Sequence, residues 1–73
     1  MITEIKEGVN RLKGKKIEAI YNLGRNKTEA IEGVISNTFN AVFTVETDDG
    51  TKSFSYVDVL SGILKIKGLN IDN

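Results

Sequence analysis

The sequence lacks the side chains that most often catalyse reactions near neutral pH. Its 73 residues include no histidine and no cysteine, so neither a histidine proton relay nor a cysteine nucleophile can form. The adjacent carboxylates Asp48 and Asp49 precede Gly50, a combination typical of a hairpin turn. Because the usual zinc ligands are also missing, we expect no enzymatic activity and no metal or other cofactor.

A phosphate-binding loop is excluded by spacing. That motif needs four residues between its two glycines, followed by lysine and then a hydroxyl residue. Here five residues separate Gly8 from Gly14, and Lys16 stands where the hydroxyl is required.

Binding chemistry is better represented than catalysis. Basic side chains gather where a helix is expected to end and again in the next expected turn: Arg11, Lys13, Lys15, Lys16, Arg25 and Lys27. The formal net charge is zero, but residues 1–27 carry +4 and residues 28–73 carry −4. If the fold gathers these six cations on one side, they can face the phosphates of RNA or DNA. The alternative is an ordinary solvated surface of mixed charge.

Phe39 is the best candidate for an exposed aromatic contact, because it lies in the polar stretch 36–40. It could stack on a base of single-stranded nucleic acid, or it could anchor the loop to the core. The other aromatic residues lie in strand-like stretches and are expected in the core: Tyr21, Phe43, Phe54 and Tyr56.

The order of elements predicts a mainly β domain with an N-terminal helix. Apolar residues at helical spacing (Ile2, Ile5, Val9 and Leu12) predict an amphipathic helix over residues 2–13, which Gly14 ends. The apolar period then falls to about two residues, which is typical of strands. The expected strands cover residues 15–22, 29–37, 40–47, 51–56 and 62–67, with a bulge or a sharp bend at Gly33, a tucked turn at 57–60 and a frayed polar tail at 68–73.

Five short strands with tight turns favour a single domain over residues 1–73, built as an SH3-like or Sm-like barrel over 15–67. The apolar face of the helix would then cap one end of the barrel. An OB-like barrel is the main competitor, but it usually carries a longer helix where this chain has only 48–50. We expect a cytoplasmic protein, because no signal peptide or membrane-spanning run is present. An exposed last strand could pair with a second copy to form a homodimer.

The sequence also resembles the Veg family of small cytoplasmic proteins from Gram-positive bacteria. The resemblance runs from about Ile2 to Ile66 and rests on short motifs in a fixed order: Leu12-Lys13-Gly14-Lys15-Lys16, Gly24-Arg25-Asn26-Lys27-Thr28, Glu32-Gly33-Val34-Ile35, Phe39 with Val42-Phe43, and Phe54-Ser55-Tyr56-Val57-Asp58-Val59-Leu60. It implies an SH3-like barrel and a role in regulating transcription linked to biofilm formation. It implies no recognised catalytic residues.

Two functions therefore remain open. The first is a non-enzymatic regulatory protein that affects transcription by binding another protein, a transcription regulator. The second is direct binding of RNA or DNA through the six cations, with Phe39 as the aromatic contact. The two differ in their salt dependence, because phosphate contacts weaken steeply as salt rises.

Overall fold

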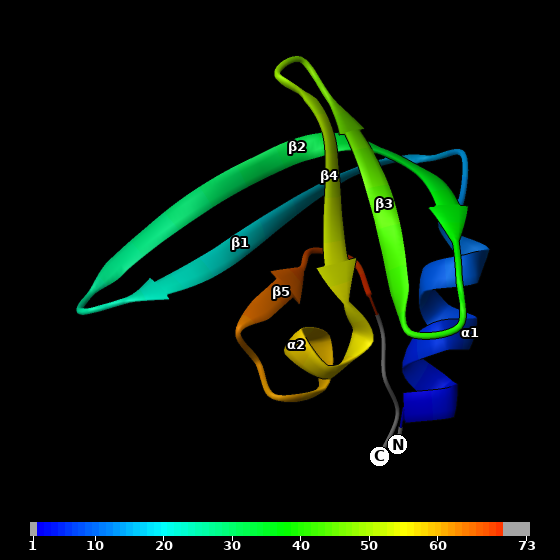
Figure 1. The fold of residues 1–73 in the computed structure, drawn as a ribbon, viewed down its shortest axis with the longest axis horizontal. Helices are drawn as coiled ribbons and strands as arrows, with labels where there is room; N and C mark the ends of the chain where they lie inside the picture. The colour runs from blue at the N-terminus through cyan, green and yellow to red at the C-terminus, as the bar shows by residue number, and fades with distance from the viewer. Residues whose placement is uncertain (1, 70–73) are drawn as a thin grey trace.

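The computed structural model describes residues 2–69. It contains an N-terminal helix, five antiparallel strands in one sheet, and a single helical turn before the last strand (Figure 1). The elements are α1 (Ile2–Arg11), β1 (Lys16–Gly24), β2 (Lys27–Thr38), β3 (Val42–Thr47), β4 (Gly50–Ser55), α2 (Tyr56–Leu60) and β5 (Leu64–Ile66). The prediction of a mainly β domain with an N-terminal helix is confirmed.

The strands follow one another across the sheet in the order β4-β3-β2-β1-β5, and every neighbouring pair is antiparallel. Within residues 2–69 no ladder joins β4 to β5, and α2 lies between them in the chain. The predicted closed barrel is therefore not what the structure shows. β5 has only three residues, which pair with Ala19–Tyr21 of β1, so little strand remains to close the sheet.

Helix α1 buries one face in the core, where it contacts α2 and β2. Ile5 and Val9 are fully buried, Leu12 is half-buried, and Ile2 is 37% exposed, so the predicted apolar stripe is correct except at its first position. The helix ends at Arg11 rather than residue 13, because the chain turns there to reach β2. The Gly14 backbone N–H donates to the Ile35 carbonyl oxygen at 2.8 Å.

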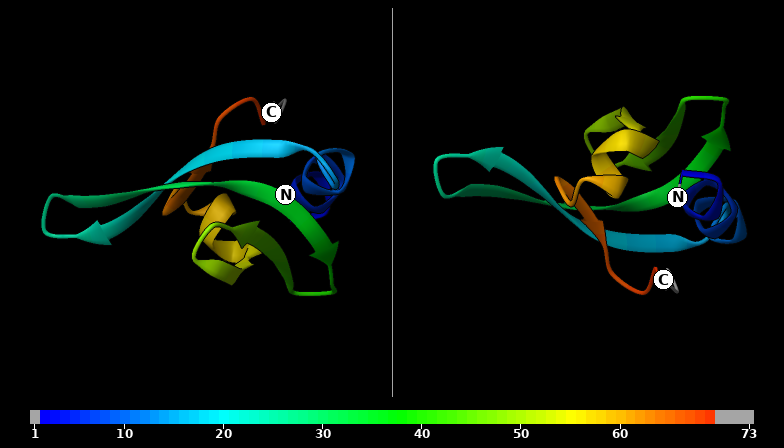
Figure 2. Two further views of the ribbon diagram at one scale, coloured as in Figure 1. Left: turned by 90° about the horizontal axis from the view of Figure 1, so that it is seen from above. Right: turned by 90° about the horizontal axis from the view of Figure 1, so that it is seen from below.

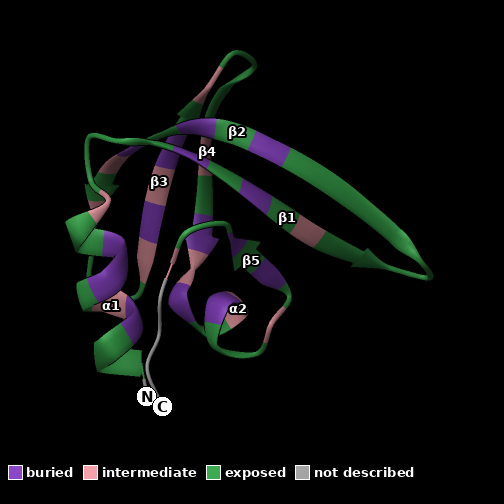
Figure 3. Ribbon diagram, turned by 180° about the vertical axis from the view of Figure 1, so that it is seen from behind, coloured by how far each residue is buried: buried purple, intermediate pink, exposed green. Residues whose placement is uncertain are grey.

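Buried residues lie along both helices and on the strands (Figure 3). A chain of aromatic rings runs through this core. Phe43 is fully buried, and its ring centroid lies 5.9 Å from that of Phe54 and 5.4 Å from that of Tyr56. Tyr21 extends the chain at 5.7 Å from Phe54 and is half-buried. Such tilted ring pairs add to the free energy of area burial, and the predicted core position is confirmed for Phe43, Phe54 and Tyr56.

The β1–β2 hairpin is a long ribbon that projects away from the other elements (Figure 2). Its turn holds Arg25 at φ 51° and Asn26 at φ 63°, the left-handed backbone that a two-residue hairpin turn requires. A register shift between Asn22 and Gly24 adds twist next to the turn. The predicted hairpin turn at Asp48 and Asp49 is also confirmed.

Directly after Gly33, strand β2 begins to pair with β3 as well as with β1. The first β2–β3 pair is Val34 with Glu46, and a Cβ atom on Gly33 would overlap the Glu46 carbonyl oxygen. The predicted bend at Gly33 thus corresponds to a close backbone approach. The bulge itself lies a little further along, between Ile35 and Asn37.

Two predictions near the C-terminus are wrong. Residues 57–60 were expected to form a tucked turn, but they belong to helix α2, where Val57 and Leu60 are more than half exposed. Ser55 caps this helix, its Oγ accepting from the Val57 backbone N–H at 3.1 Å. The frayed tail does not begin at Gly68, because Leu69 packs against the core. Residues 70–73 of that tail lie outside the described residues.

Helix α1 has ten residues and α2 has five. Among residues 2–69, neither helix is long and apolar enough to cross a membrane.

Candidate binding groove

A groove of about 340 Å³ lies between α1 and the loop that joins β2 to β3. Figure 1 shows the loop beside the helix. The helix contributes polar positions spaced three and four residues apart, which share one face. The lining residues are Thr3, Lys6, Glu7 and Asn10 from α1, Thr38 and Phe39 from the end of β2 and the loop, and Tyr56 from α2.

Two side-chain hydrogen bonds tie the loop to the helix. The Thr38 hydroxyl donates to Asn10 Oδ1 at 3.2 Å, and Lys6 Nζ donates to Asn40 Oδ1 at 3.3 Å. The loop is also closed on itself, because the Phe39 backbone N–H donates to the Val42 carbonyl oxygen at 2.8 Å. These contacts fix the backbone on both sides of Phe39.

The aromatic residues of the groove differ in exposure. Phe39 at the rim is 55% exposed, whereas Tyr56 at the base is 1% exposed. Lys6 Nζ lies 5.8 Å from the centroid of the Tyr56 ring, within the range of a cation–π contact. The groove therefore offers one exposed ring, a cation, a carboxylate and an amide, which suit non-covalent recognition.

Tyr56 makes the folding stability of the domain depend on pH in the alkaline range. Burial raises the pKa of the Tyr56 phenol above its ordinary value of 10.0, and the backbone of Phe39 offsets part of this increase. The folded state therefore holds the phenol proton more tightly than the unfolded state. The stabilisation from this difference is complete below pH 10 and is lost as the pH rises through the folded-state pKa.

Tyr56→Phe should remove this dependence. Urea unfolding followed by circular dichroism from pH 8 to 11.5 should show a steeper loss of stability above pH 10 in the wild type than in the variant. The difference between the two proteins is the quantity to measure, because every other titratable group is common to both. Parallel curves would show that the phenol is not responsible.

The six predicted cations do not form one surface. Arg11, Lys13, Lys15 and Lys16 lie where α1 ends and β1 begins, whereas Arg25 and Lys27 lie at the far tip of the β1–β2 hairpin (Figure 1). The nine residues of β1 separate the two groups, and at about 3.3 Å per residue this is a span of about 30 Å. The helix-exit group and the hairpin-tip group therefore face different surroundings.

Comparison with known proteins identifies the family. Residues 1–67 match the model of the family described as biofilm formation stimulator VEG. The chain belongs to the Veg family. The resemblance seen in the sequence is thereby confirmed, and the family description connects this chain with the stimulation of biofilm formation. No curated protein matches the chain.

Within this Veg-family chain, the helix-exit cations themselves have different surroundings. Arg11 lines a small hollow on the flank opposite the groove, together with Gly8, Leu12 and Leu69. Lys16 pairs with Glu32 across the outer face of the sheet at 3.4 Å. Lys13 and Lys15 are exposed and, within residues 2–69, have no carboxylate partner.

Phe39 is the only one of the seven predicted binding residues that lines the groove of this Veg-family chain. The predictions missed its partners on α1, chiefly Lys6 and Asn10, and its base, Tyr56. The sequence contains a signal for Lys6 and Asn10, because they recur with Thr3 at helical spacing on a polar face. The contact of that face with the loop depends on where β2 ends, which local sequence does not show.

Proposed function

We propose that this protein is a non-enzymatic cytoplasmic regulator that modulates the transcription of biofilm-associated genes by binding another protein, a transcription regulator, through the groove. The observation that carries the proposal is Phe39, an aromatic ring that is 55% exposed on a backbone fixed by hydrogen bonds on both sides. Exposed, preorganised aromatic side chains are the usual centres of binding energy at protein interfaces. The family supplies the link with biofilm formation.

The charge distribution favours a protein partner over a nucleic acid. Among residues 2–69, the groove lining carries one lysine and one glutamate, Lys6 and Glu7, so these described residues give it no excess of either sign. The other predicted cations lie on the opposite flank of α1, in the segment that follows this helix, and at the distant hairpin tip. A surface that follows a phosphate backbone would need these charges side by side.

The proposal also takes the fold as an open relative of the SH3-like barrels. The sheet order β4-β3-β2-β1-β5, with one helical turn before the last strand, supports this reading. Such folds bind partners at shallow aromatic surfaces and at strand edges. Self-association through β5 remains a prediction, and the three-residue length of β5 makes it a short edge for that purpose.

Phe39→Ala should weaken binding of the regulator by roughly tenfold or more, because truncating an aromatic hot spot costs upwards of about 1–2 kcal/mol. The partner is identified by mass spectrometry after capture on the tagged wild-type protein, and its affinity for each variant is measured by calorimetry. Leu23→Ala is the matched control, because Leu23 is 56% exposed but lies on the projecting hairpin. Equal affinities for the Phe39 and Leu23 variants would contradict the proposal.

One observation favours nucleic-acid binding as a second candidate. Lys13 and Lys15 lie two residues apart without a carboxylate partner in the described part of the chain. Binding through them should show a steep salt dependence and should disappear in the double variant K13E/K15E. A mobility-shift assay with mixed RNA and DNA pools at low salt tests this, and the absence of any shift would exclude it.

A further inference from the structure

The strand β2 has an open edge over residues 27–32, the segment before β3 joins it. On one side these residues pair with β1, but the ladder with β3 begins only at Val34. The register of residues 28–34 against β1 is continuous, without a bulge. The segment contains no proline, and no described strand covers it. Proline, bulges and charged side chains commonly protect a sheet edge from further pairing. Residues 28–32 contain the charged residues Glu29 and Glu32 but no proline and no bulge.

The hydrogen-bonding groups on this edge can be assigned from β1. The Asn22 backbone N–H donates to the Ile63 carbonyl oxygen, and the Glu18 carbonyl oxygen accepts from the Lys67 N–H, each at 2.8 Å. Asn22 and Glu18 therefore direct their backbone groups toward β5 and away from β2. Two residues directly opposite in an antiparallel pair either both direct their backbone N–H and C=O groups at each other or both direct them away from each other.

The β2 partners of those residues must therefore point outward as well. Thr28 lies opposite Asn22, Ala30 opposite Ile20, and Glu32 opposite Glu18. The N–H and C=O groups of Thr28, Ala30 and Glu32 consequently face the side that β3 does not reach. They form a row of three donors and three acceptors, the pattern that an added strand requires.

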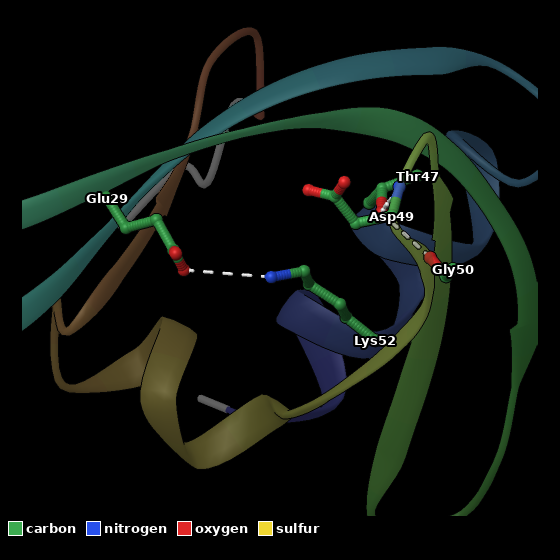
Figure 4. A network of polar contacts seen from close by, with 5 residues as sticks. All are labelled: Glu29, Thr47, Asp49, Gly50 and Lys52. Atoms are coloured by element: carbon green, nitrogen blue, oxygen red, sulfur yellow. Dashed lines mark hydrogen bonds and ion pairs between the residues drawn. The ribbon is translucent and has the colours of Figure 1, made fainter.

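Negative charge lies directly beside this edge. A notch of about 150 Å³ separates β2 from the β3–β4 turn and includes Glu29, Glu32, Asp48 and Asp49 among its lining residues. Lys52 is the one basic residue among the described residues of the lining, and its Nζ lies 3.8 Å from Glu29 Oε1 (Figure 4). Asp48 and Asp49 have no cationic partner in the part of the chain that the structure describes.

The turn that carries these two carboxylates is itself well fixed. The Thr47 hydroxyl accepts from the Asp49 backbone N–H at 3.2 Å and donates to the Gly50 carbonyl oxygen at 2.8 Å (Figure 4). The notch therefore presents its charge at a defined position, at the end of the space in which an added strand would lie.

We propose that the open edge of β2 binds an extended, basic segment of a partner protein by strand addition. The row of backbone groups supplies the affinity for an extended chain, and the carboxylates of the notch select lysine or arginine side chains. A second copy of this chain is disfavoured as the occupant, because self-pairing would bring the same carboxylates toward one another. The site is separate from the groove around Phe39 and goes beyond the function proposed for it.

Synthetic eight-residue peptides with blocked ends test the proposal by NMR titration of the ¹⁵N-labelled full chain. A peptide alternating lysine and valine should shift the amide signals of Thr28, Ala30 and Glu32. A glutamate–valine peptide of the same pattern should not bind, because its charge matches that of the notch. A lysine–proline peptide should bind more weakly than the lysine–valine peptide, because proline cannot donate hydrogen bonds to the edge.

Two variants test separately how much the carboxylates of the notch and the backbone groups of the β2 edge contribute to peptide binding. D48N/D49N should weaken binding of the lysine–valine peptide about fivefold, as expected for two exposed ion pairs, while Asp58→Asn on α2 should leave it unchanged within twofold. Ala30→Pro should weaken it about fivefold by removing an outward N–H. It should leave the β1 ladder intact, because the Ala30 backbone faces away from β1. Unchanged shifts in the core amides would show that this variant is folded.

Other outcomes would overturn the proposal. They are equal binding of the basic and acidic peptides, shifts confined to the groove around Phe39, or no shifts at all. Sedimentation that shows a dimer of the free protein which Ala30→Pro dissociates would also overturn it, because a second copy would then occupy the edge. Phe39→Ala should not affect peptide binding, so the result is independent of the groove.

Discussion

Gly33→Ala is expected to remove roughly 3 kcal/mol from the free energy of unfolding, because a methyl group forced into a close-packed site and the hydrogen bonds it displaces each cost about 1–3 kcal/mol. The added Cβ would overlap the carbonyl oxygen of Glu46, which is backbone and cannot rotate away. β3 would have to move off β2 at its first pair, Val34 with Glu46. The total free energy of unfolding of a domain of this size is only about 4–11 kcal/mol.

The measurement is urea unfolding followed by circular dichroism, with Gly14→Ala as the control. Gly14 has open space around its Cβ position but a φ of +84°, so alanine there costs only the backbone term of about 1 kcal/mol. The difference between the two variants isolates the overlap with Glu46. A Gly33 variant no less stable than the Gly14 variant would show that β3 can shift freely.

Phe43→Ala should destabilise the domain by about 4 kcal/mol, within the range of 3–5 kcal/mol for removing a fully buried phenylalanine. Phe43 is 0% exposed and joins the rings of Phe54 and Tyr56, so its loss opens a cavity in the middle of the aromatic chain. The variant should be largely unfolded at 37 °C, and urea unfolding at 10 °C measures what stability is left.

Phe39→Ala is the matched comparison, since it makes the same chemical change at a site that is 55% exposed. It should lower the free energy of unfolding by less than about 1 kcal/mol, as surface substitutions usually do. The two phenylalanines should thus separate the core from the proposed binding surface. Equal destabilisation would mean that Phe39 anchors the loop, the alternative reading of its sequence.

The elements that could be predicted are those with a strong local pattern. The spacing of Ile5 and Val9 identified α1 and its buried face, and Asp48-Asp49-Gly50 identified the β3–β4 turn. The short helix α2 was missed because five residues carry too little periodicity. Its one local signal was Ser55, which caps the helix.

The arrangement of the cations could have been predicted in part. Nine residues at about 3.3 Å each must place the two ends of β1 far apart, so Lys16 and Arg25 could not share a surface once the strand was recognised. The groove could not have been found in this way. It depends on the hydrogen bonds between Asn10 and Thr38 and between Lys6 and Asn40, which join residues about 30 positions apart.

The contact of Leu69 with α1 matters for choosing where a recombinant fragment should stop. The family match ends at residue 67, yet the side chain of Leu69 lies against Gly8, where an added Cβ would come within 2.7 Å of the Leu69 Cδ1 atom. A fragment cut at the family boundary would uncover Gly8 and one side of Leu12. Fragments that extend at least through Leu69 should therefore hold the first helix more firmly on the sheet.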